Sequence, residues 1–173
     1  MKTKIVSTIL LIAASLFANA AEPAKTKPAS PEFERMKTLV GTWSGKTDMG
    51  QGLVEMTVSY RLIAAGSVIE ERMMEGTPNE MVTMYYDDKD GKLALTHYCM
   101  LGNRPAMGVK SSDANSITFD FDGACCTVDP VKDSHMHGMV VKFVDSETIS
   151  TSCKAIMEGK EMPEHATTLK RVK

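Results

Sequence analysis

From Gly41 onward, apolar and polar residues alternate along short segments in the pattern of β-strands. One example is the run Val54, Met56, Val58 and Tyr60, in which the residues between are polar. Because successive side chains of a strand point to opposite faces, each segment has one apolar face. Ten strands are expected, at Gly41–Thr47, Leu53–Leu62, Ser67–Glu75, Met81–Tyr86, Lys92–Met100, Ala106–Lys110, Ser116–Phe121, Met136–Val144, Thr148–Ile156 and Ala166–Val172.

The connections between these segments are short and contain residues that favour turns, such as Gly76–Asn79, Asp90–Gly91 and Gly102–Asn103. They are too short for crossovers, so consecutive strands should be antiparallel neighbours. A meander of this many strands hides its two edges best by closing on itself. The pattern therefore predicts an all-β, roughly ten-stranded antiparallel up-and-down barrel.

The segment before the first strand has a helical period instead. Ser30 suits an N-cap and Pro31 suits a first helical position. Phe33, Met36, Leu39 and Val40 follow at spacings of three and four, and Gly41 ends the pattern. A short N-terminal helix is expected to precede the barrel.

The N-terminus resembles a secretory signal peptide in three features. Lys2 and Lys4 form a basic start, Ile5–Phe17 is apolar, and Ala18–Ala20 suits signal peptidase. The apolar run is short for a membrane span, which needs about 20 residues. We expect residues 1–20 to be the signal peptide, 21–30 a disordered tether and 31–173 one β-barrel domain in the periplasm or outside the cell.

The charge and composition of the chain indicate that its binding partner is a small molecule. The formal charge is −2, and it becomes more negative without Lys2 and Lys4. Basic clusters and long amphipathic helices are missing from the sequence, which argues against nucleic acid and, after signal removal, against membrane. The 14 methionines are scattered, so they indicate an adaptable core filler rather than a copper-handling surface.

Three motifs carry a resemblance to a known class of proteins. They are the Gly-x-Trp of LVGTWSG at Leu39–Gly45, THYC followed by GNRP, and HMHG followed by FVD. Together they resemble a bacterial family of lipocalin-like (calycin) proteins of unassigned function, with a more distant similarity to nitrobindin-like haem barrels. The resemblance implies a small-molecule cavity inside the barrel with Trp43 plugging one end. In nitrobindin-like proteins a histidine near the C-terminus binds haem, and His165 lies in that region.

All histidines and cysteines are expected at one rim of the barrel. In an up-and-down meander, the ends of odd strands and the starts of even strands meet at the same rim. If Ala106–Lys110 is a strand, that rim collects His97, Cys99, Cys125, Cys126, His135, His137, Cys153 and His165. The leading hypothesis is a binding protein for a largely apolar molecule, with ligand-binding residues His97, Tyr98, Cys99, Met139, Phe119 and Trp43.

A metal site at the same rim is the alternative. His97-x-Cys99 and His135-x-His137 each place two ligands on one face of a strand, about 7 Å apart. Imidazole and thiolate together suit Zn or Cu. The competing interpretation is that His97 and Cys99 line an organic ligand's pocket and that His135 and His137 bond to the neighbouring loop.

The cysteines and the lack of catalytic motifs limit both hypotheses. In an oxidising compartment Cys99 could pair with Cys125 or Cys126 and would then be lost as a ligand, and Cys153 is a further candidate. A bond between the adjacent Cys125 and Cys126 would be strained. Enzymatic activity is the least favoured class, because the sequence shows no nucleophile motif, phosphate loop or carboxylate pair, although three histidines around an open position could activate water.

Overall fold

The computed structural model describes residues 28–48, 52–123 and 128–173. The elements are α1 (Pro31–Met36), a 3₁₀ turn (Lys37–Leu39), β1 (Gly41–Asp48), β2 (Leu53–Ile63), a second 3₁₀ turn (Ala64–Gly66), β3 (Val68–Met73), β4 (Met81–Asp87), β5 (Leu93–Tyr98), β6 (Ala106–Ser112), β7 (Ser116–Phe121), β8 (His135–Asp145), β9 (Thr148–Met157), β10 (Lys160–Glu161) and β11 (His165–Arg171). The predicted signal peptide and residues 21–27 of the predicted tether lie outside the described residues. Within the described ranges no helix has the length and apolar character needed to span a membrane.

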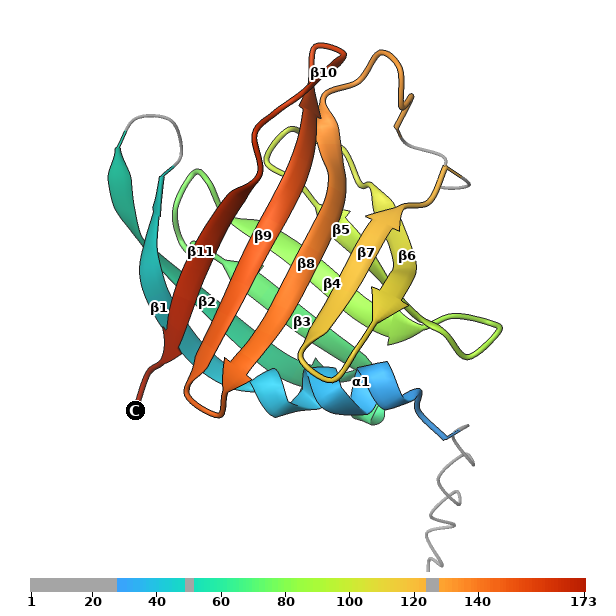
Figure 1. The fold of residues 1–173 in the computed structure, drawn as a ribbon, viewed down its shortest axis with the longest axis vertical. Coiled ribbons are helices and arrows are strands. Elements are labelled where there is room, and N and C mark those ends of the chain that lie inside the picture. The colour runs from blue at the N-terminus through green and yellow to red at the C-terminus, as the bar shows by residue number, and fades with distance from the viewer. Residues whose placement is uncertain (1–27, 49–51, 124–127) are drawn as a thin grey trace, which may run out of the picture.

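Ten of these strands close into one antiparallel barrel (Figure 1). Consecutive strands pair from β1 to β9, and the C-terminal strand β11 then lies between β9 and β1. The two-residue strand β10 only extends the hairpin after β9, and the sequence pattern did not predict it. The predicted all-β, ten-stranded antiparallel barrel with a short N-terminal helix is confirmed.

The segment from α1 through its 3₁₀ turn closes one end of the barrel (Figure 1). Its apolar residues Phe33, Met36 and Leu39 are buried and join the core cluster. The indole Nε1 of Trp43 donates a hydrogen bond to the Leu39 carbonyl over 2.7 Å. The Arg171 guanidinium lies over the same indole ring, 4.2 Å from its centroid. Trp43 is thus fixed between the helical segment and the last strand.

Gly45 explains why the first strand can sit so close to the last. A Cβ atom added at Gly45 would collide with the backbone carbonyl of Thr168 on β11 and would press on the Leu169 side chain. β1 and β11 pair through Gly45 and Leu169, and this pairing closes the barrel. A side chain at position 45 would therefore push apart the two strands that form the seam.

Ser30 is predicted to contribute to stability through two hydrogen bonds. Its Oγ caps the helix by accepting from the Phe33 N–H over 3.0 Å, and it donates to Asp87 Oδ1 over 2.6 Å. Ser30→Ala should lower the free energy of unfolding by about 1 to 2 kcal/mol, since it removes the cap and the bond to β4. Urea denaturation measures the change. The control Ser111→Ala, at an exposed strand position, should change stability by less than about 0.5 kcal/mol. Equal effects of the two substitutions would contradict this role of Ser30.

The opposite end of the barrel is the rim where β1, β3, β5, β7 and β9 end and where β2, β4, β6, β8 and β11 begin. β6 spans Ala106–Ser112, so the strand on which the rim prediction depends is present. His97 and Cys153 fall near the ends of β5 and β9, and His135 and His165 begin β8 and β11. The predicted gathering at one rim is therefore confirmed for these residues. Cys125 and Cys126 lie outside the described residues.

Candidate functional site

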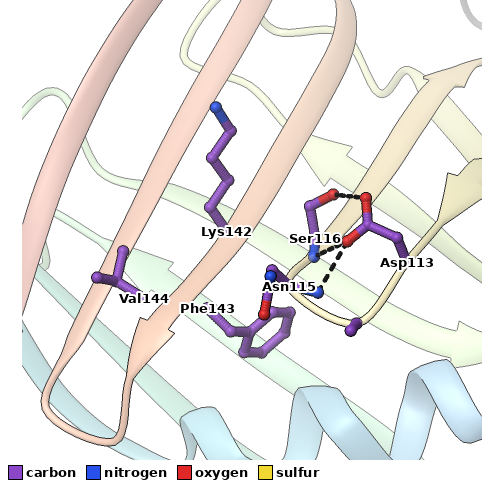
Figure 2. Close-up of a pocket in the computed structure, with 7 residues that line it drawn as sticks. Asp113, Asn115, Ser116, Lys142, Phe143 and Val144 are labelled. Atoms are coloured by element: carbon purple, nitrogen blue, oxygen red, sulfur yellow. Dashed lines mark hydrogen bonds between the residues drawn. The ribbon is translucent and has the colours of Figure 1, made fainter.

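The depression drawn in Figure 2 lies at the helix end and is not a candidate binding site. It has a volume of about 540 Å³ and is lined by Asp113–Ser116 and Lys142–Val144. The Asp113 carboxylate accepts hydrogen bonds from the backbone N–H groups of Asn115 and Ser116 and from the Ser116 hydroxyl. Arg35 bonds to the Asp113 and Ser116 carbonyls. These polar groups hold the β6–β7 turn against the helix, so the depression is a by-product of that turn.

Solvent reaches the inner face of the barrel from the opposite rim. Cross-strand partners share a face, and the pairs Leu169–Ile149, Thr167–Thr151 and His165–Cys153 run in that order toward the rim. Leu169 and Ile149 are each 1% exposed, whereas His165 and Cys153 are both exposed. Since Leu169 and Ile149 belong to the core, all three pairs face inward. The inner face is therefore sealed at the helix end and accessible at the rim.

Four polar residues form a continuous row across the inner face, which we call the polar belt: Tyr60, Glu71, Thr83 and His97. They are direct cross-strand partners on β2, β3, β4 and β5. All four are buried, between 2% and 4% exposed. The apolar residues Ile69, Tyr85 and Leu95 form the next buried row toward the helix end. Polar groups at this depth are costly unless they are hydrogen-bonded.

Glu71 is the acidic residue of the polar belt. The Tyr85 hydroxyl donates a hydrogen bond to its Oε2 and also lies 3.7 Å from the Met139 sulfur. Burial raises the pKa of the Glu71 carboxyl to about 7, and the nearby Tyr85 and Tyr60 hydroxyls act in the opposite direction. Burial and the two tyrosine hydroxyls account for the shift of this pKa, and no cation contributes to it. Glu71 is thus a buried acid that titrates near neutral pH without a positive partner.

Tyr60 and His97 flank the acid with different hydrogen bonding. Burial, and then the Glu71 charge, raise the pKa of Tyr60 well above its ordinary value. Its hydroxyl oxygen is buried near the Glu71 carboxyl, and the interaction of the two side chains also raises the pKa of Tyr60. This oxygen has no hydrogen-bond partner of suitable geometry among the described residues. His97 Nδ1 lies 3.0 Å from the Thr83 hydroxyl oxygen. Burial lowers the pKa of His97 to about 4, so its ring is neutral at physiological pH.

Thioether side chains lie directly above the polar belt, on the rim side. Val58, Met73 and Met81 are cross-strand partners one row closer to the rim than Tyr60, Glu71 and Thr83. Met73 and Met81 are only partly buried, whereas Val58 is 1% exposed. Methionine side chains are unbranched and adapt to irregular shapes. The polar belt is therefore separated from solvent mainly by flexible groups.

The predicted ligand-binding residues do not all lie in this region. His97 belongs to the polar belt, and Met139 contacts Tyr85 beside it. Phe119 and Trp43 are each 1% exposed in the core, Phe119 against the Tyr85 ring and Trp43 at the helix end. Tyr98 follows His97 and so takes the opposite, outer face, where it is 44% exposed.

The two histidines of His135-x-His137 form a cluster apart from His97. A bulge between Met136 and Gly138 interrupts the alternation of β8, and Met136 packs against the core. Both imidazole rings pack against the Phe121 ring, with centroid distances of 4.9 Å for His135 and 5.4 Å for His137. His135 Nε2 lies 3.0 Å from His137 Nδ1, and His135 Nδ1 lies 2.7 Å from the Asp133 carbonyl oxygen.

This bonding occupies both ring nitrogens of His135. A carbonyl only accepts, so the Nδ1–H of His135 donates to the Asp133 carbonyl, and His135 Nε2 is bonded to His137 Nδ1. Burial, and then His135, lower the pKa of His137. The charged neighbours of His137 are Asp120, Lys154 and Glu161, and the last two form an ion pair. His135 therefore has no open lone pair, as the interpretation of loop-bonded rim histidines expects.

The four predicted metal ligands His97, Cys99, His135 and His137 are not brought together. In the part of the chain that the structure describes, no group of three or more His, Cys, Asp or Glu side chains is placed to hold a metal ion. Cys99 and Cys153 are free thiols. Burial, and then the charges of Glu164 and Cys99, raise the pKa of Cys153, which keeps that thiol protonated. The pairing of Cys99 with Cys125 or Cys126 involves residues outside the described ranges.

Sequence reasoning missed Glu71, although the sequence carried a signal for it. In VIEERM, Ile69, Glu71 and Met73 share one strand face. Because Glu70 and Glu71 are adjacent, any register of this strand turns one of them inward. Glu70 takes the outer face, where Arg61 and Arg72 pair with it. A carboxylate on an otherwise apolar face was the available indication of a functional position.

Comparison with known proteins leaves the family open. No family model matches the chain, and no curated protein matches it. Among solved structures, it is similar to the crystal structure of a protein with unknown function from the DUF3598 family of Nostoc punctiforme, with 12% sequence identity and a TM-score of 0.44. The match covers 88% of this chain and 53% of that one, so the chain spans about half the length of that protein. The closed ten-stranded barrel is consistent with a calycin-like architecture.

Proposed function

We propose that this protein binds a small, largely apolar molecule on the inner face of its barrel, between the accessible rim and the polar belt. The observation that carries the proposal is the buried Tyr60 hydroxyl, which has no hydrogen-bond partner among the described residues. A buried unsatisfied hydroxyl costs about 1 to 3 kcal/mol, so its presence at the base of an accessible interior needs an explanation. A polar group on the ligand would supply the missing bond.

The groups around the polar belt suit such a ligand. The inner face above the belt offers Val58, Met73 and Met81, which supply apolar and polarizable contact area. The adaptable thioethers of Met73 and Met81 can move aside for a ligand without breaking a backbone hydrogen bond. Small-molecule sites commonly combine an apolar lining with a few buried polar groups that fix the orientation. The inner face has this composition.

Binding of a neutral apolar fluorophore, N-phenyl-1-naphthylamine, tests the proposal. The wild-type protein should bind one equivalent with saturable enhancement of its emission. Cys153→Trp places a bulky ring on the inner face and should weaken binding at least about tenfold, or about 1.4 kcal/mol. The matched control Thr168→Trp places the same ring at an exposed position on the neighbouring strand β11 and should leave binding unchanged. Absence of saturable binding, or equal effects of both substitutions, would contradict the proposal.

Export of the protein is a second part of the proposal, and it is supported by the signal-peptide pattern of residues 1–20. Protein recovered from a periplasmic or extracellular fraction should begin at Ala21, as measured by N-terminal sequencing. Protein that retains Met1 and stays in the cytoplasm would contradict this part and would leave the binding proposal intact.

A further inference from the structure

The inner face carries a carboxylic acid and no lysine or arginine beside it. From the polar belt to the rim, the described strand residues that face inward include one carboxyl, Glu71, the two imidazoles of His97 and His165, and no lysine or arginine. The nearby Arg61 and Arg72 lie on the outer face, where they pair with Glu70. The Glu70 carboxylate is therefore paired with two arginines on the outer face, whereas no arginine or lysine pairs with Glu71.

The groups that face Glu71 from the surrounding strands are all uncharged at neutral pH. They are Tyr60 on β2, Thr83 and Tyr85 on β4, His97 on β5 and Met139 on β8. The pKa values of both tyrosines are raised by burial, and that of His97 is lowered to about 4 by burial. None of them titrates between about pH 5 and pH 8, so Glu71 sets the charge of the polar belt.

We propose that the barrel selects ligands with a cationic amine head group, which the Glu71 carboxylate binds and toward which the Tyr60 hydroxyl is placed to accept a hydrogen bond. This inference rests on the proposed function, because it names the class of ligand for the same site. An ammonium group is the positive partner that the protein does not place beside Glu71. Its N–H groups donate hydrogen bonds, which the Glu71 carboxylate and the Tyr60 hydroxyl oxygen accept. A carboxylate head group would meet Glu71 as a second negative charge, which is unfavourable in a desolvated site.

The preference can be measured with three amphiphiles that share one tail: decylamine, decanol and decanoate. Each displaces N-phenyl-1-naphthylamine from the wild-type protein at pH 7.5, and decylamine should bind at least about tenfold more tightly than decanoate. In Glu71→Gln the preference for decylamine over decanoate, measured in the same displacement assay, should fall below about threefold. Glu70→Gln alters the adjacent carboxyl on the outer face and should keep the wild-type preference.

The dependence on pH gives a second readout that a structural role of Glu71 would not produce. Ammonium binding requires the ionised carboxyl, whose pKa in the free protein is about 7. The affinity for decylamine should therefore rise about tenfold per pH unit from pH 5 to pH 6.5 and level off above pH 7.5, whereas the affinity for decanol should not change in this way. Glu71→Gln should remove the dependence.

The outcomes separate this inference from the function on which it rests. If the fluorophore binds to the wild-type protein but decanoate equals or exceeds decylamine, the amine preference is overturned and the binding function stands. A preference for decylamine that persists in Glu71→Gln also overturns it. If neither fluorophore nor amphiphile binds to the folded wild-type protein, the proposed function fails as well.

Discussion

Replacing Trp43 with alanine is expected to lower the free energy of unfolding by about 3 to 5 kcal/mol. The side chain is 1% exposed and lies within the core at the helix end. Its removal leaves a cavity and also leaves the Leu39 carbonyl without its hydrogen bond from the indole. The Arg171 guanidinium loses the ring on which it lies, although it keeps its bonds to the Val40 and Thr38 carbonyls. The helix end is thus predicted to be the most sensitive part of the barrel.

Chemical denaturation followed by far-UV circular dichroism measures this loss, since Trp43 is the sole tryptophan and its fluorescence disappears in the variant. Trp43→Phe keeps most of the apolar volume and removes the indole N–H, so it should cost clearly less than the alanine substitution. A loss below about 1 kcal/mol for Trp43→Ala would show that the helix segment does not anchor the barrel as described.

Glu71 and His97 are expected to give stability opposite dependences on pH. Burial raises the pKa of Glu71 from 4.5 to about 7, so folded protein holds a proton that unfolded protein has lost between these values. Its contribution to stability is fully present below pH 4.5 and is lost as the pH rises through 7. Burial lowers the pKa of His97 from 6.5 to about 4, so its contribution is fully present above pH 6.5 and is lost as the pH falls through 4.

Single substitutions should separate the two contributions. In Glu71→Gln, the free energy of unfolding relative to the wild type should rise by about 3 kcal/mol as the pH increases from 4.5 to 7. The variant has no carboxyl at this position whose ionisation would destabilise the folded state. In His97→Asn, stability relative to wild type should fall by a similar amount between pH 4 and pH 6.5. Urea titrations across this range measure both differences. The outer-face variant Glu70→Gln should not reproduce the rise, and a pH-independent difference for Glu71→Gln would refute the assigned burial of this carboxyl.

The barrel could be predicted from the sequence because its strands keep strict alternation between short turns. In β2, for example, Met56, Val58 and Tyr60 are buried as their spacing indicates. The helix start was equally readable, because Ser30 and Pro31 occupy the positions where a cap and a first helical residue belong. These features depend on local backbone geometry and on one buried face, which are the properties that a sequence pattern records.

The candidate site was only partly predictable, because it depends on register and on a local irregularity. The bulge at Met136–Gly138 interrupts the alternation of β8 at the two rim histidines. The sequence marks it only by Gly138, where an added Cβ would lie 3.2 Å from the Phe119 carbonyl oxygen. The polar belt joins residues from four strands, so its continuity emerges only when the registers are known. His97 was identified from its own strand, whereas its neighbours across the sheet were not.

The most direct test of the account is to locate a bound ligand with methionine methyl NMR. In protein labelled with ¹³C at the methionine ε-methyl groups, saturation with N-phenyl-1-naphthylamine should shift the signals of Met73 and Met81, which lie above the polar belt. The signals of Met36, buried at the helix end, and Met162, exposed near β10, should stay in place. Shifts confined to Met36 or Met162, with Met73 and Met81 unchanged at saturation, would contradict ligand binding on the inner face.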